Sequence, residues 1–288
     1  MKTAASRGDD MKTLIIGRDG QLGSELMRII DGAVGTSRRS KSDIYLDIKN
    51  PNSIEDIIMK VSPDVIVNTA AMTDVDGCET SPDEAYRINA IAVRHIARAA
   101  SVVGSYLIHI STDYVFDGSK GNYREDDVPN PVNYYGLSKL LGEAYALSYD
   151  DALVVRTSGV YGVKLNFPLY VAKTLRAGGT VKCIDSYYSP IHASQLAMAI
   201  KEIISRRLYG IIHVSGPRIS RFDFAIKIKE RLDIESGKII MENERKILLA
   251  NRPYDSSLNN GRAKRILEYR FEDIDNGIEM LRDKYEVI

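Results

Sequence analysis

The sequence predicts an α/β fold in which a doubly wound parallel sheet carries a smaller α/β domain at one edge. Short runs that are apolar on both faces alternate with helical stretches as far as Gly162, which is typical of a Rossmann-type sheet. The first apolar run ends in a glycine-rich turn. Beyond Gly162 the alternation weakens into irregular pieces, and we expect these to form a substrate domain over the carboxyl edge of the sheet, where such folds bind ligands.

The expected elements follow in order along the chain. Apolar runs predict strands at residues 14–16, 33–37, 64–68, 106–110, 153–155 and 211–214. Helices are expected at residues 22–30, 53–61 and 82–103, and another is expected to start near Tyr135. We expect the Rossmann-type domain to comprise residues 11–157 and 188–217, and the substrate domain to comprise residues 158–187 and 218–288.

The overall composition argues against two classes of partner. Lys and Arg total 39, as do Asp and Glu, so the formal net charge is zero and nothing suggests nucleic acid or an anionic membrane as a partner. No apolar run reaches the roughly 20 residues that span a bilayer. The 2 cysteines lie far apart and match no metal or redox spacing, so we expect free thiols, a cytoplasmic location and no metal site.

The first residues of the chain look separate from the fold. Residues 1–10 are polar and lack the apolar stretch of a signal peptide. The first three residues, Met-Lys-Thr, recur at residues 11–13. We therefore expect Met11 to be the natural start and residues 1–10 to be an N-terminal extension with no role in the fold.

The turn after the first strand carries three glycines spaced three apart. Gly17 would permit the tight turn, Gly20 would let the backbone approach a pyrophosphate, and Gly23 would let helix and strand pack closely. Unpaired N–H groups at the start of the next helix would face the phosphates. Glycine turns also serve purely structural ends, but the strand before this turn and the helix after it favour dinucleotide binding.

The end of the second strand indicates which dinucleotide binds. A carboxylate about 20 residues after the turn would bond the ribose 2′-hydroxyl of NAD, whereas this chain has Ser37, Arg38 and Arg39 there. Two guanidiniums suit a 2′-phosphate, so we predict NADPH as the preferred cofactor, with NADH as the alternative. The arginines could instead simply face solvent.

A candidate proton donor lies further along the chain. Tyr135 and Lys139 are four residues apart, so they lie on one face of the predicted helix. A free tyrosine has a pKa near 10, and a nearby ammonium would lower that pKa toward the working range. A Tyr-x-x-x-Lys pair is common by chance. It gains weight here because Thr112, at the end of the preceding strand, can hold a carbonyl beside the phenol.

In this order, the glycine turn, Thr112 and the Tyr135/Lys139 pair resemble the extended short-chain dehydrogenase/reductases. Longer matches narrow the resemblance to the dTDP-4-dehydrorhamnose reductase family. They are Gly20-Gln21-Leu22-Gly23, Asn68-Thr69-Ala70-Ala71, residues 111–118 (STDYVFDG), residues 131–139 (PVNYYGLSK), Gly142-Glu143, Arg156-Thr157-Ser158, Asn166-Phe167, Ser189-Pro190 and Arg252-Pro253. The resemblance covers residues 11–288, and the 111–118 segment is specific.

The resemblance implies reduction of a nucleotide-linked 4-keto-6-deoxy sugar by NADPH, as in the formation of dTDP-rhamnose. Tyr135 would protonate the developing alkoxide, Lys139 would hold the nicotinamide ribose and lower the tyrosine pKa, and Thr112 would bond the carbonyl oxygen. Cofactor contacts are then expected from Gly17, Gly20, Gln21, Leu22, Gly23, Ser37, Arg38, Arg39, Asp47, Ile48, Asn68, Ala70, Ala71, Tyr135 and Lys139. Substrate contacts are expected from Thr73, Asp74, Val115, Phe116, Asn166 and Arg252.

Several positions depart from the family's pattern, all in the substrate half. The family often has a tryptophan where this chain has Gly159, and a tyrosine where it has Met72. The family also often reads Asp-Gln-x-Gly-Ser-Pro-Thr where residues 185–191 read DSYYSPI. Tyr187 or Tyr188 could supply a replacement stacking face for the sugar, or both could be packing residues.

Two hypotheses follow from these residues. The first is an NADPH-dependent reductase, and the related dehydratases are excluded because they place an acid–base glutamate where this chain has Tyr114. The second is a non-catalytic, NADP-binding regulatory subunit resembling that of methionine adenosyltransferase, which also departs in the sugar-contacting half. The intact Thr112, Tyr135 and Lys139 favour the enzyme. The sequence does not identify the sugar or base, and it leaves a homodimer open.

Overall fold

The computed structural model describes residues 11–39, 44–162, 164–242, 249–271 and 273–282. The expected N-terminal extension, residues 1–10, lies outside these ranges. Within them, no helix has both the length and the apolar character that crossing a membrane requires.

The centre of the molecule is a seven-stranded sheet with the order β11-β6-β5-β4-β1-β2-β3, and every neighbouring pair in it is parallel. The predicted fold class is thereby confirmed. The strands are β1 (Thr13–Ile16), β2 (Val34–Ser37), β3 (Ile44–Tyr45), β4 (Val65–Asn68), β5 (Tyr106–Thr112), β6 (Ala152–Thr157) and β11 (Gly210–His213). The sequence predicts all of them except the two-residue β3.

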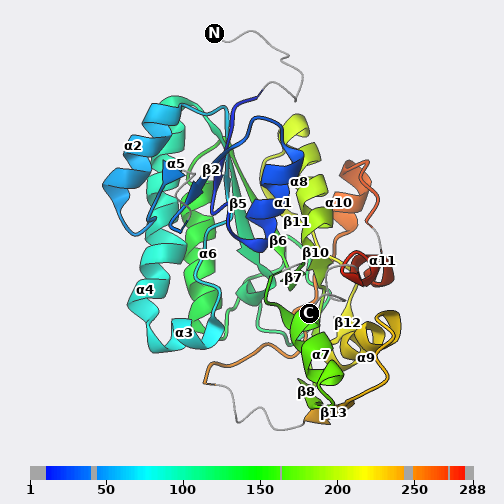
Figure 1. The fold of residues 1–288 in the computed structure, drawn as a ribbon. Helices are drawn as coiled ribbons and strands as arrows, with labels where there is room; N and C mark the ends of the chain where they lie inside the picture. The colour runs from blue at the N-terminus through cyan, green and yellow to red at the C-terminus, as the bar shows by residue number, and fades with distance from the viewer. Residues whose placement is uncertain (1–10, 40–43, 163, 243–248, 272, 283–288) are drawn as a thin grey trace.

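Helices cover both faces of this sheet (Figure 1). On one face, α1 (Gln21–Ile29) and α8 (Ala193–Arg206) pack Leu26 and Ile200 against the strands, because their apolar residues recur at helical spacing. On the other face, α2 (Pro51–Val61), α5 (Ala92–Val103) and α6 (Tyr134–Leu147) do the same with residues such as Ile54 and Ile96. The strands therefore bury both of their faces, as a doubly wound sheet requires.

The segment predicted as a helix at residues 82–103 is helical over that whole range and contains a π-helical turn. The chain forms α3 (Val75–Thr80), α4 (Pro82–Tyr86), a π-helical turn (Arg87–Ile91) and then α5. The buried amide of Asn89 accepts from the Met72 backbone N–H at 2.8 Å and donates to the Ser138 hydroxyl on α6 at 3.0 Å. These bonds place Asn89 beside α6, and a π-turn inserts the extra residue that such a placement needs.

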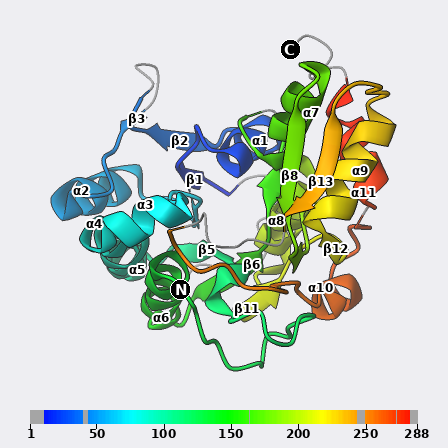
Figure 2. The same ribbon diagram turned by 90° about the horizontal axis from the view of Figure 1, so that it is seen from below.

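A smaller unit lies beside the sheet (Figure 2). Its elements are α7 (Phe167–Arg176), β8 (Thr180–Ile184), β9 (Tyr187–Tyr188), β12 (Ile219–Ser220), α9 (Arg221–Arg231), β13 (Lys238–Glu242) and α11 (Ile274–Glu279). It has its own apolar core, which includes Leu175, Phe224 and Ile278. Strand β8 pairs in parallel with β13, and β9 pairs antiparallel with β12.

Two connections join the smaller unit to the sheet. Strand β7 (Val160–Tyr161) pairs in parallel with β10 (Ile191–His192). Helix α10 (Gly261–Ile266) returns to the main sheet, where Ala263 joins its apolar core. The sequence places residues 218–288 as a whole in the substrate domain, and these domain limits stay a prediction.

The order of the sheet reverses between β1 and β4. The chain moves outward from β1 to β3 and then returns to the other side of β1, so the crossover helices lie on opposite faces and leave a crevice at the carboxyl ends of β1 and β4. The glycine turn follows β1, and Thr69 and Ala70 follow β4. This position is where the sequence predicts a dinucleotide.

Candidate active site

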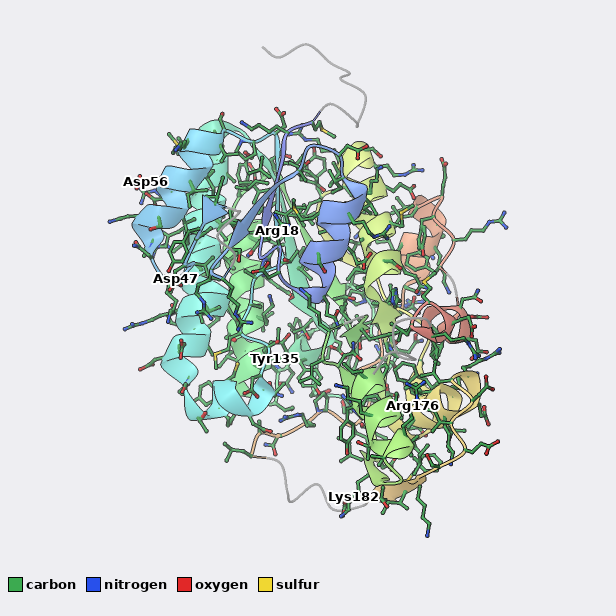
Figure 3. All side chains as sticks on the ribbon, viewed as in Figure 1. Arg18, Asp47, Asp56, Tyr135, Arg176 and Lys182 are labelled. Atoms are coloured by element: carbon green, nitrogen blue, oxygen red, sulfur yellow. The ribbon has the colours of Figure 1, made fainter. Side chains whose placement is uncertain are left out.

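A pocket of about 800 Å³ opens at the carboxyl edge of the sheet. Its wall comes from the glycine turn, from the ends of β2, β4, β5 and β6, from α6 and from the smaller unit. Figure 3 labels Arg18 in the glycine turn and Tyr135 on α6 near the centre of the view. Gly17, Gly20 and Gly23 line the pocket together with Tyr135, so one cavity joins the predicted dinucleotide turn to the predicted proton donor.

The glycine turn has no room for side chains. Gly17 has φ +91°, and a Cβ on it would lie 2.9 Å from the backbone nitrogen of Ala70. A Cβ on Gly23 would collide with the Gly17 carbonyl oxygen, so glycine there lets α1 approach β1. A Cβ on Gly20 would approach the same oxygen to 3.3 Å. This close packing agrees with the tight turn predicted at Gly17 and with the close approach of helix and strand predicted at Gly23.

Beyond the turn, the pocket wall continues to the edge of the sheet. Ser37, Arg38 and Arg39 line it, as do Asp47 and Ile48. Both arginines are exposed. Ser37 accepts the Arg39 backbone N–H at 2.9 Å, and its hydroxyl donates to the Asp19 carboxylate. Two cations therefore lie on the pocket wall where a 2′-phosphate is expected.

The predicted catalytic residues meet on the opposite wall. Thr112 is the last residue of β5, and Tyr135 lies in the first turn of α6, which Asn133 caps by accepting the Gly136 N–H at 2.8 Å. The Thr112 and Tyr135 side chains are hydrogen-bonded to each other. Lys139 follows one turn later and also lines the pocket. The sequence thus predicted side chains that the structure brings together.

Burial shifts the two titrating groups of this cluster in opposite directions. It raises the pKa of Tyr135, which the bond from Thr112 partly offsets. It lowers the pKa of Lys139 to about 8, against the opposing charge of Glu143. The Lys139 ammonium donates to the Ile110 carbonyl at 2.6 Å. The expected lowering of the Tyr135 pKa by Lys139 stays a prediction for the coenzyme-bound protein.

A buried carboxylate fixes Thr112, and the sequence did not single it out. Asp113 accepts from the hydroxyls of Thr112 at 3.1 Å, Ser158 at 2.7 Å and Ser256 at 2.5 Å. Burial raises its pKa, while the three hydroxyl donors oppose the shift. Asp113 lies in the 111–118 segment that resembles the family, but its neighbours in sequence do not indicate this role. One of its hydrogen-bond partners, Ser256, lies 143 residues away.

The remaining wall of the pocket comes from Tyr114, Thr157, Gly159, Tyr188 and Arg221. Tyr114 packs edge-on against Tyr135, with ring centroids 5.8 Å apart. Gly159 has φ +47°, and a Cβ on it would lie 2.6 Å from the Tyr188 ring. Tyr188 thus occupies the space beside position 159. Tyr187 lies outside this wall and packs edge-on against Tyr254.

Other predicted site residues also line the pocket: Gln21, Leu22, Ala70, Ala71 and Thr73. Six predicted cofactor or substrate contacts do not line the pocket: Asn68, Asp74, Val115, Phe116, Asn166 and Arg252. Tyr187, one of the two candidates for a stacking face, does not line it either. Asn68 contacts the buried His109 ring at 3.1 Å, and Asn166 caps α7. Arg252 pairs with Asp76 at 3.1 Å.

Two of these residues are turned inward for a clear reason. After Thr112 the chain makes a 3₁₀ turn, Asp113–Val115, which carries Val115 and Phe116 into a small core with Tyr123 and Leu258. The Phe116 ring stacks on Tyr123 with centroids 4.2 Å apart. Binding roles for Val115, Phe116 and the other residues outside the wall stay predictions. In the part of the chain that the structure describes, no group of three or more His, Cys, Asp or Glu could hold a metal.

Comparisons with known proteins agree with this geometry. A family model described as the RmlD substrate binding domain matches residues 11–287. The dTDP-4-dehydrorhamnose reductase of Aggregatibacter actinomycetemcomitans is 34% identical over 247 residues, which cover 81% of this chain and 82% of that protein. The chain belongs to the dTDP-4-dehydrorhamnose reductase family. The resemblance that the sequence motifs predicted is thereby confirmed.

Solved structures of this reductase family share the fold. The crystal structure of a hypothetical dTDP-4-dehydrorhamnose reductase from Sulfolobus tokodaii is 52% identical, with a TM-score of 0.88 over 92% of this chain and 98% of that chain. That of the Bacillus anthracis reductase in complex with NADP is 29% identical, with a TM-score of 0.87 over 93% and 97% of the two chains.

Proposed function

We propose that the protein is an NADPH-dependent reductase of a nucleotide-linked 4-keto-6-deoxy sugar. The observation that carries this proposal is that Thr112, Tyr135 and Lys139 line the same pocket as the glycine turn. Family membership supports an oxidoreductase that acts on a sugar nucleotide. It favours this reading over the regulatory-subunit alternative, because the relatives described above are named as reductases.

The residues present fit a nicotinamide dinucleotide. A Cβ at Gly17 or Gly23 would collide with the backbone of the turn or of Ala70, so these glycines allow the tight turn and bring the start of α1 to the pocket, where a diphosphate would bind. The exposed Arg38 and Arg39 would hold a 2′-phosphate, which favours NADPH over NADH. A bound NADPH would supply the hydride that reduces the sugar carbonyl.

The protein's part in the reaction is to place and move one proton. The Thr112 hydroxyl donates to Asp113 at 3.1 Å in this structure, and it would turn from that carboxylate to donate to the carbonyl oxygen of a bound substrate. Tyr135 would give its proton to the alkoxide as it forms, which is general acid catalysis. Lys139 would bond the nicotinamide ribose and stabilise the resulting phenolate. Tyr114 occupies the position of the dehydratase glutamate, so the chain lacks that base for elimination.

A Tyr135→Phe variant tests the proposal. We expect turnover of NADPH with dTDP-4-keto-6-deoxy sugars to fall roughly 10²–10⁴-fold, because only the acid is lost. NADPH affinity should stay close to that of the wild type, since the ring is retained. Turnover is measured by NADPH absorbance, and affinity by coenzyme fluorescence. A wild type that binds NADPH but reduces no sugar in a panel of such substrates would make the regulatory subunit the better proposal.

Two further expectations are independent of this assay. The homodimer that the sequence leaves open is tested by sedimentation velocity. The cytoplasmic location stays a prediction from the sequence.

A further inference from the structure

Two arginines that are three residues apart, Arg218 and Arg221, differ in whether they have a charged partner and whether they line the pocket. Arg218 stacks on the ring of Tyr187 at 3.8 Å and forms an ion pair with Asp255 at 2.8 Å. Arg221 stacks on the next ring, Tyr188, at 4.5 Å. Only Arg221 lines the pocket, and its guanidinium makes no ion pair with any residue that the structure describes.

The surroundings hold Arg221 in place without neutralising it. Its guanidinium also lies 5.6 Å from the Phe167 ring centre and donates a hydrogen bond to the Tyr114 side chain. The Asp113 carboxylate acts on the guanidinium through its charge. That carboxylate already accepts from three hydroxyls, as described above, and does not pair with the guanidinium. A rigid, planar cation therefore faces the pocket with donors to spare.

Two buried hydroxyls beside it also have no partner within the described chain. They are the phenol of Tyr188 and the hydroxyl of Thr157, and both residues are 5% exposed and line the pocket. Both oxygen atoms have less than 1 Å² of accessible surface, so neither reaches a ligand in the pocket unless its side chain turns. The group of this cluster that lines the pocket as a cation is the Arg221 guanidinium, which suits an anionic oxygen group.

The position of this cluster identifies the group. Arg221 bonds Tyr114, and Tyr114 packs against the proton donor Tyr135 at 5.8 Å. Arg221 is therefore one side chain away from the carbonyl that would be reduced. In a 4-keto sugar nucleotide the diphosphate is attached at C1, across the ring from C4. A cation separated from Tyr135 by the Tyr114 ring therefore lies on the side of the pocket where the diphosphate is expected.

We propose that Arg221, held on the Tyr188 ring, binds the diphosphate of the nucleotide sugar. This inference rests on the proposed function, because it assigns a subsite for the same substrate. Arg221 is then a substrate-binding residue that positions the sugar. It takes no part in proton transfer.

The test measures binding of free nucleoside diphosphates, which needs no turnover. Isothermal titration of dTDP, UDP, GDP and CDP into the wild type saturated with NADP+ identifies the base that binds most tightly. With that nucleotide, Arg221→Gln should weaken binding roughly 10-fold to 100-fold, because a charge-assisted contact is lost. Arg221→Lys, which keeps the charge, should restore part of the affinity.

Arg218→Gln is the matched control, since it removes a stacked arginine outside the pocket. We expect its nucleotide affinity to stay within about two-fold of the wild type. NADPH affinity should be unchanged in all variants, which shows that the fold and the coenzyme half are intact. In steady-state assays Arg221→Gln should raise KM for the keto sugar nucleotide far more than it lowers kcat.

The outcomes separate this inference from the proposed function. Equal nucleotide affinity in the wild type and Arg221→Gln overturns the diphosphate subsite even if the enzyme reduces its sugar. The absence of binding of every nucleoside diphosphate to the wild type also overturns it. A wild type that binds a nucleotide through Arg221 but reduces no keto sugar supports the subsite and counts against the proposed reductase.

Discussion

Lys139 is the residue of this site whose burial has the clearest consequence for stability. It is 2% exposed, and its pKa falls to about 8 in the folded protein. An unfolded lysine keeps a pKa of about 10.4. Below pH 8 both states carry the proton and the full penalty for burying the charge applies. Between pH 8 and about pH 10.4 the unfolded state binds a proton that the folded state has lost, so the free energy of unfolding rises with pH.

This difference can be measured against Lys139→Met, which removes the titrating group. We expect the unfolding free energy of the wild type, relative to the variant, to rise by about 2 kcal/mol between pH 7 and pH 9.5 in the absence of coenzyme. The lost bond to Ile110 adds an offset that does not depend on pH. Urea denaturation at several pH values gives the comparison. A relative stability that is flat or falls with pH contradicts the depressed pKa.

Single residues also show the limits of sequence reasoning. Tyr135 and Lys139 were predictable because they occur in one short motif. Arg221 was not predictable, because its proposed role depends on two contacts that distinguish it from Arg218. Arg221 stacks on the Tyr188 ring and forms no ion pair with a described residue, whereas Arg218 pairs with Asp255. These relations join distant parts of the chain, and no local pattern records them.

Among the elements, α6 is positioned by contacts at two of its glycines. A Cβ on Gly136 would collide with the Tyr114 carbonyl oxygen, and a Cβ on Gly142 would collide with the Asn89 carbonyl oxygen in the π-helical turn. Both collisions are with backbone atoms, which cannot move aside as a flexible side chain can. The helix that carries Tyr135 thus rests directly on the backbone of its neighbours.

We therefore expect Gly142→Ala to destabilise the protein by about 1–3 kcal/mol despite the better helix propensity of alanine. Displacement of α6 should also lower turnover. Leu141→Ala is the control, because it places an alanine one residue away on the exposed side of the same helix. Thermal and urea unfolding of both variants provide the measurement. Equal stability of Gly142→Ala and the wild type would show that α6 has room to move.

At the same scale, the predicted elements and the missed ones differ in length. Most strands of the main sheet were predictable because they contain short apolar runs that are buried on both faces, as in β1, β4 and β6. Strands β7, β9, β10 and β12 have only two residues each. Two residues carry no periodicity, and their pairing depends on segments distant in sequence. The π-helical turn at residues 87–91 likewise accompanies the contacts of one buried amide, that of Asn89.

For the whole molecule, coenzyme binding should add measurable stability, because the pocket wall comes from both the sheet and the smaller unit. NADPH at 100 times its Kd should raise the unfolding free energy by about 2.7 kcal/mol. NADH at the same concentration should raise it less. The double variant Arg38→Ser/Arg39→Ser should remove this difference, whereas Arg28→Ser, an exposed arginine on α1 paired with Glu25, should not. Unfolding in denaturant with each coenzyme measures this difference. If NADPH and NADH raise the unfolding free energy of the wild type equally, the predicted preference for NADPH is wrong.

The overall architecture was predictable because one repeated rule, a buried strand followed by a helix, covers half the chain. The sheet order and its reversal beside β1 follow from that rule together with short connections. The smaller unit is different. Helix α10 lies within residues assigned to it by sequence, yet Ala263 packs with the main sheet. Which apolar core a helix packs against depends on the path of the whole chain and cannot be predicted from the residues of that helix alone.

The contact between Gly159 and Tyr188 restricts which residues these two positions can hold together. Any side chain at 159 meets the Tyr188 ring at its first carbon, 2.6 Å away. The positive φ of Gly159 adds a second barrier. A larger residue at position 159 therefore requires a smaller one at position 188 first, which fixes the order in which the two positions can change.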